Sequence, residues 1–278
     1  MYYKQLKNII IAIVAFLPLL VKCQINYGSN NGKFLTIRGT KVYYEEYGKG
    51  VPLLMLHGGF GDITDFQKVI PKLSEKYRVI IPDAPGLGRS GYADSILSYQ
   101  LLADYSSKFI DLLKLDSVYV IGWSDGGNTA LILAKDRPEK VKKIIVSGAN
   151  YKLDGFTKEA LEECKNLTDT NWVKKELEGW IKHYQELSTK NWRRYVSEGG
   201  TMWFNEQYFP KNDLEKIQAS TLVVYGDKDM FTLEHGIEIR NAIKNSQFCV
   251  IPDCSHQVFY EKPELFIELA LTFLNKKK

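Results

Sequence analysis

The sequence predicts an α/β fold with a mostly parallel central sheet, helices on both faces and an inserted helical cap. Short apolar runs rich in β-branched residues alternate along the chain with amphipathic segments long enough for helices. Apolar runs without polar alternation are typical of strands buried on both faces of a parallel sheet. The composition agrees, because 45% of the 278 residues are hydrophobic and 25% are charged, as in ordinary globular proteins.

The strands are expected in two groups. Phe34–Arg38 and Lys41–Tyr47 flank Gly39-Thr40, and this pattern predicts a β-hairpin ahead of the main sheet. The apolar runs expected to form the remaining strands are Val51–Leu56, Arg78–Ile81, Val118–Ile121, Ile144–Val146, Leu222–Tyr225 and Phe248–Ile251.

The alternation of strands and helices lapses for about seventy residues after Ile144–Val146 and resumes at Leu222–Tyr225. The intervening segment, about residues 150–213, has a helical pattern and is expected to form a cap inserted in a single domain of residues 24–278. Long insertions over strand ends usually carry substrate specificity. Its recurrent aromatic residues, most of which are expected to pack the cap against the body, are Trp172, Trp180, Tyr184, Trp192, Tyr195 and Trp203.

Residues 1–23 have the pattern of a signal peptide. Two lysines precede the apolar run Ile9–Val21, whose 13 residues suit a signal sequence and fall short of the ~20 that a membrane-spanning helix needs. The expected product is secreted or periplasmic, without a stable membrane span after processing. Lys22 is not the small residue that a cleavage site prefers, so a lipid anchor on Cys23 and an uncleaved anchor remain alternatives.

Charge and cysteine content exclude several classes of protein. The net charge is +4, but without the first 23 residues the chain carries 34 basic and 33 acidic residues, which gives no sign of nucleic-acid binding. The cysteines show no metal-ligand spacing, so neither a metal nor a cofactor is expected. Cys249 and Cys254 could close a small disulfide loop or remain free thiols.

The sharpest chemical motif is Gly122-Trp123-Ser124-Asp125-Gly126. It follows the apolar run Val118–Ile121 and precedes a helix expected from near Gly127 to Arg137. Glycines on both sides of a serine, between a strand and a helix, permit the sharp turn that projects a nucleophilic hydroxyl above the sheet. Ser124 is therefore the predicted nucleophile.

A serine nucleophile requires a base, and the chain has four histidines. His256 follows the last expected strand and so lies at the same end of the sheet as Ser124, which makes it the predicted base. His57 ends the strand Val51–Leu56 and is expected to order a loop. His183 falls in the cap and His235 in a helix.

The base in turn requires an acid that fixes its tautomer. The loop after Leu222–Tyr225 offers Asp227 and Asp229. Asp229 lies further from the strand end, where its side chain could reach His256, and is the predicted acid. Asp227 is expected to hold a turn.

The oxyanion hole is predicted from two main-chain amides. One is the amide of Asp125, directly after the nucleophile. The other comes from His57-Gly58-Gly59-Phe60, where Gly59 is the predicted donor and Phe60 the alternative. Phe60 and the side chain of Asp125 are also expected to contact the substrate.

At these residues the sequence resembles the α/β-hydrolase superfamily over essentially the whole chain after residue 23. The supporting motifs, in chain order, are His57-Gly58-Gly59, Asp83-Ala84-Pro85-Gly86-Leu87-Gly88-Arg89-Ser90, the segment around Ser124, Gly226-Asp227-Lys228-Asp229 and Ser255-His256. Gly122–Gly127, with Ser147–Asn150 downstream, is similar to the biphenyl-hydrolase-like (valacyclovir hydrolase) group. That resemblance implies an α-amino-acid ester as substrate, with its ammonium held by Asp125. The chain departs from the group in its export signal and in its His-Gly-Gly.

The expected function is therefore that of a serine hydrolase acting on a small-molecule ester or related acyl bond. A cofactor-free perhydrolase or haloperoxidase, an aminopeptidase, and a ligand-binding receptor with a vestigial triad remain alternatives on the same fold. For Asp125 the alternative to substrate binding is a structural role. Its carboxylate would then bind loop amides near Gly58-Gly59 or pair with a cap residue such as Arg193 or Arg194.

Overall fold

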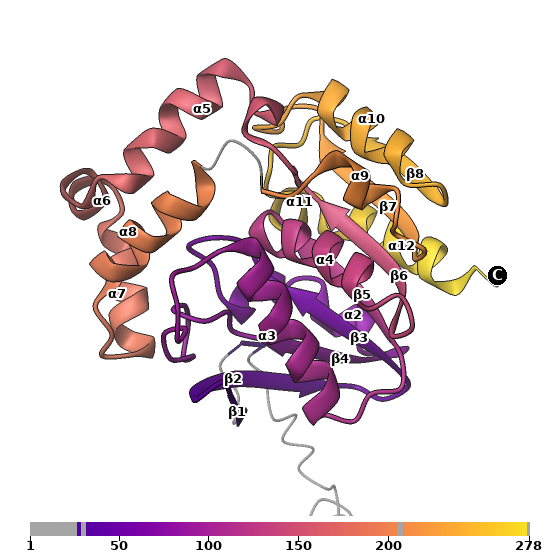
Figure 1. Cartoon of the computed structure of the whole chain (residues 1–278), viewed down its shortest axis with the longest axis horizontal. Helices are drawn as coiled ribbons and strands as arrows, with labels where there is room; N and C mark the ends of the chain where they lie inside the picture. The colour runs from indigo at the N-terminus through magenta and orange to yellow at the C-terminus, as the bar shows by residue number, and fades with distance from the viewer. Residues whose placement is uncertain (1–26, 29–31, 205–207, 277–278) are drawn as a thin grey trace, which may run out of the picture.

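The computed structural model describes residues 27–28, 32–204 and 208–276; the expected signal peptide, residues 1–23, lies outside them. The described chain contains one eight-stranded sheet in the order β1-β2-β4-β3-β5-β6-β7-β8 (Figure 1). Its strands are β1 (Lys33–Ile37), β2 (Thr40–Tyr47), β3 (Val51–Leu56), β4 (Tyr77–Pro82), β5 (Val118–Trp123), β6 (Val141–Ser147), β7 (Ser220–Gly226) and β8 (Ser246–Ile251).

The pairing of the strands confirms the predicted fold class. β1 and β2 form the expected antiparallel hairpin, and β2 also pairs antiparallel with β4. Every other neighbouring pair in the described sheet is parallel. All the apolar runs expected to be strands lie within β3 to β8, with boundaries that differ by at most three residues.

Two apolar cores form because successive strand residues face opposite sides of the sheet. In β3, Leu54 and Leu56 belong to one core, whereas Leu53 and Met55 belong to the other. The first core includes residues of α3 (Tyr99–Leu112), α4 (Asp125–Asp136) and α10 (Leu233–Ala242). The second includes residues of α2 (Ile70–Leu73), α11 (Val258–Glu261) and α12 (Pro263–Asn275). Helices therefore cover both faces, as predicted.

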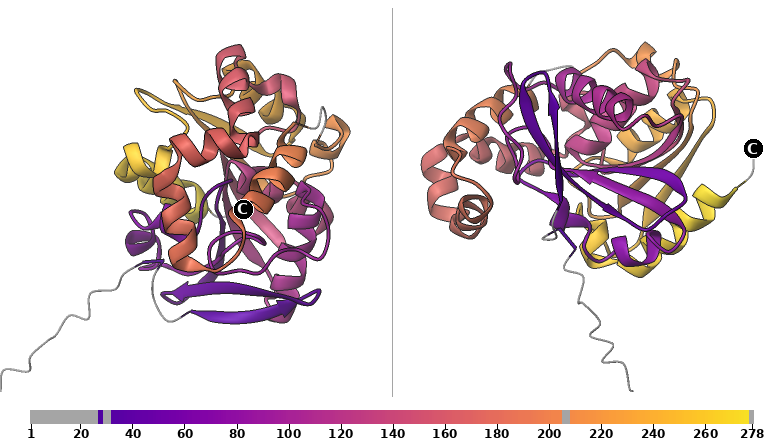
Figure 2. Two further views of the ribbon diagram at one scale, coloured as in Figure 1. Left: turned by 90° about the vertical axis from the view of Figure 1, so that its left-hand side faces the viewer. Right: turned by 90° about the horizontal axis from the view of Figure 1, so that it is seen from below.

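The segment between β6 and β7 contains η2 (Leu153–Gly155), α5 (Lys158–Lys165), η3 (Asn166–Thr168), α6 (Thr170–Glu176), α7 (Glu178–Leu187), α8 (Trp192–Trp203) and α9 (Lys211–Leu214). We call α5 to α8 the cap helices. Side chains of Thr157, Asp169 and Asn191 accept main-chain N–H groups and so begin α5, α6 and α8. Figure 2 shows the cap helices at one end of the molecule and the C-terminus at the other.

The cap helices are anchored to the loop after β4. The Lys190 ammonium, in the connection between α7 and α8, donates to the carbonyl oxygens of Leu87, Gly88 and Ser90. Burial lowers the pKa of Lys190 to about 8. Tyr184 of α7 adds a hydrogen bond of 2.7 Å from its hydroxyl to the Gly86 carbonyl.

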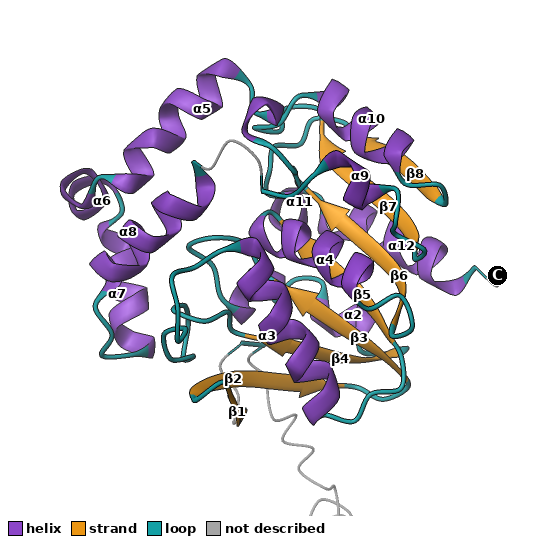
Figure 3. Ribbon diagram, in the orientation of Figure 1, coloured by secondary structure: helices purple, strands orange, loops and turns teal. Residues whose placement is uncertain are grey.

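The parallel strands β3 and β6 point their carboxyl ends toward the cap helices (Figure 3). Loops at the carboxyl ends of parallel strands build the ligand site in open α/β sheets, and here the cap helices stand beside that edge. No helix in the described ranges is long and apolar enough to cross a membrane.

Candidate active site

Ser124 lies at the sharp turn between β5 and α4. Its φ of 54° and ψ of −120° fall outside the regions favoured by non-glycine residues. The flanking glycines are required by close packing, since a Cβ on Gly122 would lie 2.2 Å from the Gly126 carbonyl oxygen, and one on Gly126 would lie 2.0 Å from that of Leu56. The Ser124 amide donates to Ser147 O at 2.9 Å, which fixes the turn to β6.

Helix α4 begins at Asp125, two residues earlier than the sequence indicated. The reason is that the Ser124 carbonyl already accepts hydrogen bonds from the amides of Gly127 and Asn128, at 2.8 and 3.0 Å. Ser124, the predicted nucleophile, is therefore the N-cap residue, and the positive end of the helix dipole lies directly behind it.

His256 and Asp229 are paired in the loops after β8 and β7. His256 Nδ1 lies 2.8 Å from Asp229 Oδ1, and the Asp229 side chain is fully buried. With Nδ1 donating its proton to this carboxylate, Nε2 is the unprotonated nitrogen that a general base needs. The indole of Trp123, the residue before Ser124, donates to the His256 carbonyl at 2.8 Å and ties the base to β5.

Asp227 stabilises a turn, which is the role that the sequence suggested for it. Its Oδ1 accepts the amide of Cys254 at 2.9 Å, and hydrogen bonds from main-chain amides lower the pKa of the exposed Asp227 carboxyl. The structure thus brings Asp229, and not Asp227, to His256. Cys249 and Cys254 are free thiols, so of the two alternatives for this pair the structure shows the unpaired one.

Two amides are available for an oxyanion. The Gly59 and Asp125 amides have no hydrogen-bond acceptor among the described residues. The alternative donor, the Phe60 amide, is already bonded to the Tyr195 hydroxyl at 3.2 Å. The geometry therefore favours Gly59 over Phe60 as the partner of Asp125 in an oxyanion hole.

Ser124, His256, Gly59, Phe60 and Asp125 line one cavity of about 280 Å³. The wall is mainly aromatic and apolar, and comes from the body and the cap helices. Its further members include Tyr99, Trp123, Phe156, Cys164, Leu167, Trp203, Phe204, Tyr208, Met230 and Phe231. Among the described residues that line it, the only carboxylate is that of Asp125, and there is no lysine or arginine.

Asp125 is buried and uses both carboxylate oxygens. Oδ1 accepts the Tyr99 hydroxyl at 2.7 Å, and Oδ2 accepts the Trp203 indole at 2.8 Å. Burial raises the pKa of the Asp125 carboxyl, while the bonds from Trp203 and Tyr99 oppose that rise. A carboxylate can accept about four hydrogen bonds, so acceptor capacity remains on its cavity side.

Asp125 does bind a residue of the cap, as one alternative expected, but neither the loop amides nor the arginines named for it are its partners. The carboxylate accepts no hydrogen bond from the Gly58 or Gly59 amides, and neither cap arginine reaches it. The Arg193 guanidinium lies 4.4 Å from the ring centroid of Trp192, and Arg194 pairs with Glu198 of the same helix at 2.6 Å. The cap partner is instead Trp203, in the last turn of α8, whose neutral N–H is cheaper to bury than a guanidinium.

The remaining histidines have structural partners. His57 Nε2 accepts the Ala84 amide at 2.9 Å, which leaves Nδ1 to donate to Gly58 O, and burial lowers its pKa. His57 therefore orders the loops after β3 and β4, as expected. His235 stacks on Tyr151 with ring centroids 5.0 Å apart, and burial lowers its pKa to about 4.

His183 of α7 has a partner that the sequence did not suggest. Its Nε2 lies 2.6 Å from Asp62 Oδ2, in the loop after β3. The hydrogen bond that His183 donates to the Asp62 carboxylate raises the pKa of His183. Burial opposes ionisation of Asp62, but the bonds from His183 and Thr64 outweigh it and lower its pKa to about 2.

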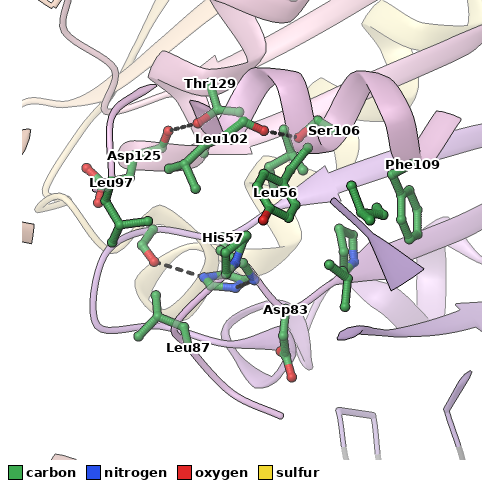
Figure 4. A pocket seen from close by; sticks show the side chains of 18 of the residues that line it. Leu56, His57, Asp83, Leu87, Leu97, Leu102, Ser106, Phe109, Asp125 and Thr129 are labelled. Carbon is green, nitrogen blue, oxygen red and sulfur yellow. Dashed lines mark hydrogen bonds between the residues drawn. The ribbon is translucent and has the colours of Figure 1, made fainter. Parts of the chain in front are cut away.

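A second, smaller cavity of about 50 Å³ shares Asp125 with the first and is drawn in Figure 4. Asp125 and Thr129 stand on one side of it, with His57, Asp83 and Leu87 on the other. Neither Ser124 nor His256 lines this space. Its wall is mainly apolar.

Sequence reasoning missed Tyr99, Trp180, Tyr195 and Trp203 as partners of the site. Trp180 donates its indole N–H to the Phe60 carbonyl at 2.7 Å, and Tyr195 accepts the Phe60 amide. The only signal for these contacts was the aromatic content of the cap, which does not say which ring reaches which loop. Within the described ranges, no group of three or more His, Cys, Asp or Glu side chains is placed to hold a metal.

Comparisons with known proteins agree with this geometry. The sequence profile of the alpha/beta hydrolase fold matches residues 51–263. The chain is 25% identical to a 2-hydroxy-6-oxo-6-(2'-aminophenyl)hexa-2,4-dienoic acid hydrolase of Metapseudomonas resinovorans, over 88% of this chain and 91% of that protein. It is 27% identical to the serine hydrolase BPHL of Homo sapiens, over 86% of this chain and 85% of that protein.

A solved structure supports the same grouping. Est816, an N-acyl homoserine lactone degrading enzyme, is 26% identical and superposes with a TM-score of 0.72, covering 87% of this chain and all of that one. Two of these relatives are named as hydrolases, and the compounds named for the first relative and for Est816 differ. The chain therefore belongs to the alpha/beta hydrolase fold family.

Proposed function

We propose that the protein is a serine hydrolase that cleaves a carboxylic ester through an acyl-enzyme on Ser124. The observation that carries the proposal is the convergence on one cavity of Ser124, the His256–Asp229 pair and two amides without acceptors. Nucleophile, oriented base and oxyanion donors are the three parts that acyl transfer requires.

The steps follow from these positions. His256 Nε2 takes the proton of Ser124 Oγ as the oxygen attacks the ester carbonyl, and the Gly59 and Asp125 amides stabilise the negative oxygen that forms. His256 then gives the proton to the departing alcohol. A water molecule, activated by the same histidine, hydrolyses the acyl-enzyme and restores Ser124.

The charge of the cavity favours a neutral or cationic substrate. A carboxylate in a largely apolar wall, with no lysine or arginine beside it among the described residues, repels a second anion and attracts a cation. The aromatic faces of Tyr99 and Trp203, which hold Asp125, also suit an ammonium group. An α-amino-acid ester, with its ammonium against Asp125, is the finer proposal for the substrate.

A second candidate is hydrolysis of a 2-hydroxy-6-oxo-dienoate. It is favoured by the similarity to hydrolases of such compounds, including a Pseudomonas putida protein that is 29% identical over 84% of this chain. A dienoate carries a carboxylate of its own, however, and the described cavity wall offers that group Asp125 and no basic side chain. The electrostatics therefore rank this candidate second.

A panel of substrates tests the proposal. Purified protein is assayed with p-nitrophenyl acetate, an aminoacyl p-nitrophenyl ester and a 2-hydroxy-6-oxo-dienoate, with Ser124→Ala as the control. The expected order of kcat/KM is aminoacyl ester, then acetate, then dienoate, all lost in the variant. Labelling of Ser124 by a fluorophosphonate without turnover of any member would instead indicate a binding protein, and preference for the dienoate would favour the second candidate.

A further inference from the structure

Phe60 is held by the cap helices on both sides. Its amide donates to the Tyr195 hydroxyl of α8 at 3.2 Å, and its carbonyl accepts the Trp180 indole of α7 at 2.7 Å. Its ring also contacts the rings of Trp180, Tyr195 and Trp203, with centroids 4.6, 5.7 and 5.3 Å away. Phe60 belongs to the body of the protein, yet the groups that fix it come from the cap helices.

The backbone at Phe60 is strained. Its φ of 59° lies in the left-handed region, which is unfavourable for a residue with a Cβ. Such a conformation persists only where surrounding contacts over-determine it. The two hydrogen bonds and three ring contacts from α7 and α8 are those contacts.

The left-handed conformation of Phe60 allows the turn to close, and the closed turn fixes the peptide plane that holds the Gly59 amide. Gly58 to Gly61 form a turn closed by a hydrogen bond of 3.3 Å from the Gly61 amide to Gly58 O, with Gly59 and Phe60 at its centre. A positive φ at the second central residue is what one class of tight turn requires. In a trans peptide the N–H points opposite to the C=O. With Gly58 O directed to the Gly61 amide and to His57 Nδ1, the Gly59 N–H points away from both groups and is left without an acceptor among the described residues.

We propose that Trp180 and Tyr195 are positioning residues for the oxyanion hole. By holding Phe60 in its left-handed conformation, they aim the Gly59 amide at the position where the oxyanion forms. Neither residue lines the catalytic cavity, so each acts through Phe60 and not through the substrate. The inference rests on the proposed function, because it concerns the hole that an acyl-transfer reaction needs.

The same contacts couple substrate binding to catalysis. Leu167, Trp203 and Phe204 of the η3–α8 region line the cavity, so a bound substrate contacts the cap segment that also holds Phe60. A substrate that packs against these residues stabilises the docked cap and, through Trp180 and Tyr195, the working geometry of Gly59. A substrate too small to reach them gains less from this arrangement.

The test compares Trp180→Phe and Tyr195→Phe with the wild type on one neutral ester. Tyr195→Phe removes only the hydroxyl that is bonded to Phe60, whereas Trp180→Phe keeps an aromatic ring but removes the indole N–H together with part of the ring. We expect kcat to fall about 10- to 100-fold, less than or equal to the loss of a whole oxyanion donor, with KM within about twofold. Phenylboronic acid, whose tetrahedral adduct on Ser124 places an oxygen in the hole, should bind more weakly by the same factor.

The matched control is Trp172→Phe, on cap helix α6, whose indole makes no hydrogen bond to residues 57–62. It should leave kcat and boronate affinity unchanged. Thermal melts followed by circular dichroism identify a variant that has lost its fold. If one of Trp180→Phe and Tyr195→Phe is unfolded, the kinetics of the folded variant test the inference. Unchanged kcat in folded Trp180→Phe and Tyr195→Phe, or a fall in kcat without loss of boronate affinity, overturns the inference. A wild type that turns over no ester overturns the proposed function itself, before any variant is compared.

Discussion

The Asp125 carboxylate accepts the indole N–H of Trp203, 78 residues further along the chain, at 2.8 Å. The residue that follows the nucleophile is thereby bonded to the last turn of α8. Tyr99 holds the other oxygen from α3. Asp125 thus helps to dock the cap on the body. If it also binds the substrate, the two roles can be separated, because the first affects stability and the second affects kcat/KM.

Asp125→Ala should weaken kcat/KM for an aminoacyl ester by about 2–4 kcal/mol, the cost of removing one partner from a buried charge pair. A neutral ester such as p-nitrophenyl acetate should be affected much less, because the main-chain amide of residue 125 survives the substitution. Steady-state kinetics on both esters measure this difference. Equal losses on the two esters would mean that the carboxylate serves docking alone.

The same substitution should also destabilise the protein, since it leaves the Tyr99 hydroxyl and the Trp203 indole without an acceptor. The expected loss in the free energy of unfolding is about 1–3 kcal/mol for each buried group left unsatisfied. Denaturant titration measures it. Asp125→Asn, which retains an acceptor oxygen, is the matched control and should lose less; a loss as large as that of Asp125→Ala would argue against this account of the two bonds.

Substitutions in the predicted triad should have the largest effect on kcat. Ser124→Ala and His256→Ala should each lower kcat by roughly 10⁴ or more while the protein stays folded, because each removes a group that the reaction cannot replace. Asp229→Asn should also be severe, since the amide cannot fix the His256 tautomer. Asp227→Asn is its control on the same loop, where only the turn to Cys254 is affected. Near-normal turnover by either of the first two, or a worse defect in Asp227→Asn than in Asp229→Asn, contradicts the assignment.

The His183–Asp62 pair predicts a pH window of stability. The folded pKa of His183 is raised above 6.5, so its contribution is full below that pH and is lost as the pH rises through the folded value. The folded pKa of Asp62 is lowered from 3.8 to about 2, so its contribution is present above 3.8 and is lost as the pH falls toward 2. Together the pair stabilises the protein most between about pH 4 and 6.5.

Thermal melts of the wild type and His183→Gln across pH 4 to 9 check this window. The melting temperature of the variant should fall furthest below that of the wild type in the acidic range and approach it in the alkaline range. Burial raises the pKa of Asp83 to about 7, so this group titrates in the same range, but both proteins contain it and its contribution largely cancels in the difference. A constant difference at all pH values would mean that the pair carries no charge.

The N-terminal segment gives a prediction of its own. Expressed in its native host, the chain should be exported and should begin near Gln24, because residues 1–23 have the apolar length of a signal sequence. N-terminal sequencing of protein from each cell fraction tests this. An intact Met1 in the cytosolic fraction contradicts it, and a lipid adduct on Cys23 would move the protein to a membrane surface.

The sequence predicted the sheet and the order of the chemical groups because those features depend on local patterns. The runs that became β3 to β8 are apolar over several successive residues, and Ser124 and His256 each directly follow a strand or its turn. The contacts of Trp180, Tyr195 and Trp203 were not predictable in this way. Each contact depends on how α7 and α8 dock against segments more than seventy residues away in the sequence. The sequence of an amphipathic helix does not indicate which distant residue an aromatic side chain will contact.

The insertion begins and ends on strands that are hydrogen-bonded neighbours, since β6 pairs with β7 directly. An exchange of residues 150–213 between homologues would therefore leave the sheet intact, which makes the insertion a natural unit for building chimeric enzymes. However, α7 and α8 form hydrogen bonds with Phe60 and Asp62, which lie in the loop after β3. A cap from a homologue would face a loop with different side chains, so a functional chimera has to exchange residues 57–62 together with the insertion. We therefore expect the sequences of these two distant segments to change together among homologues.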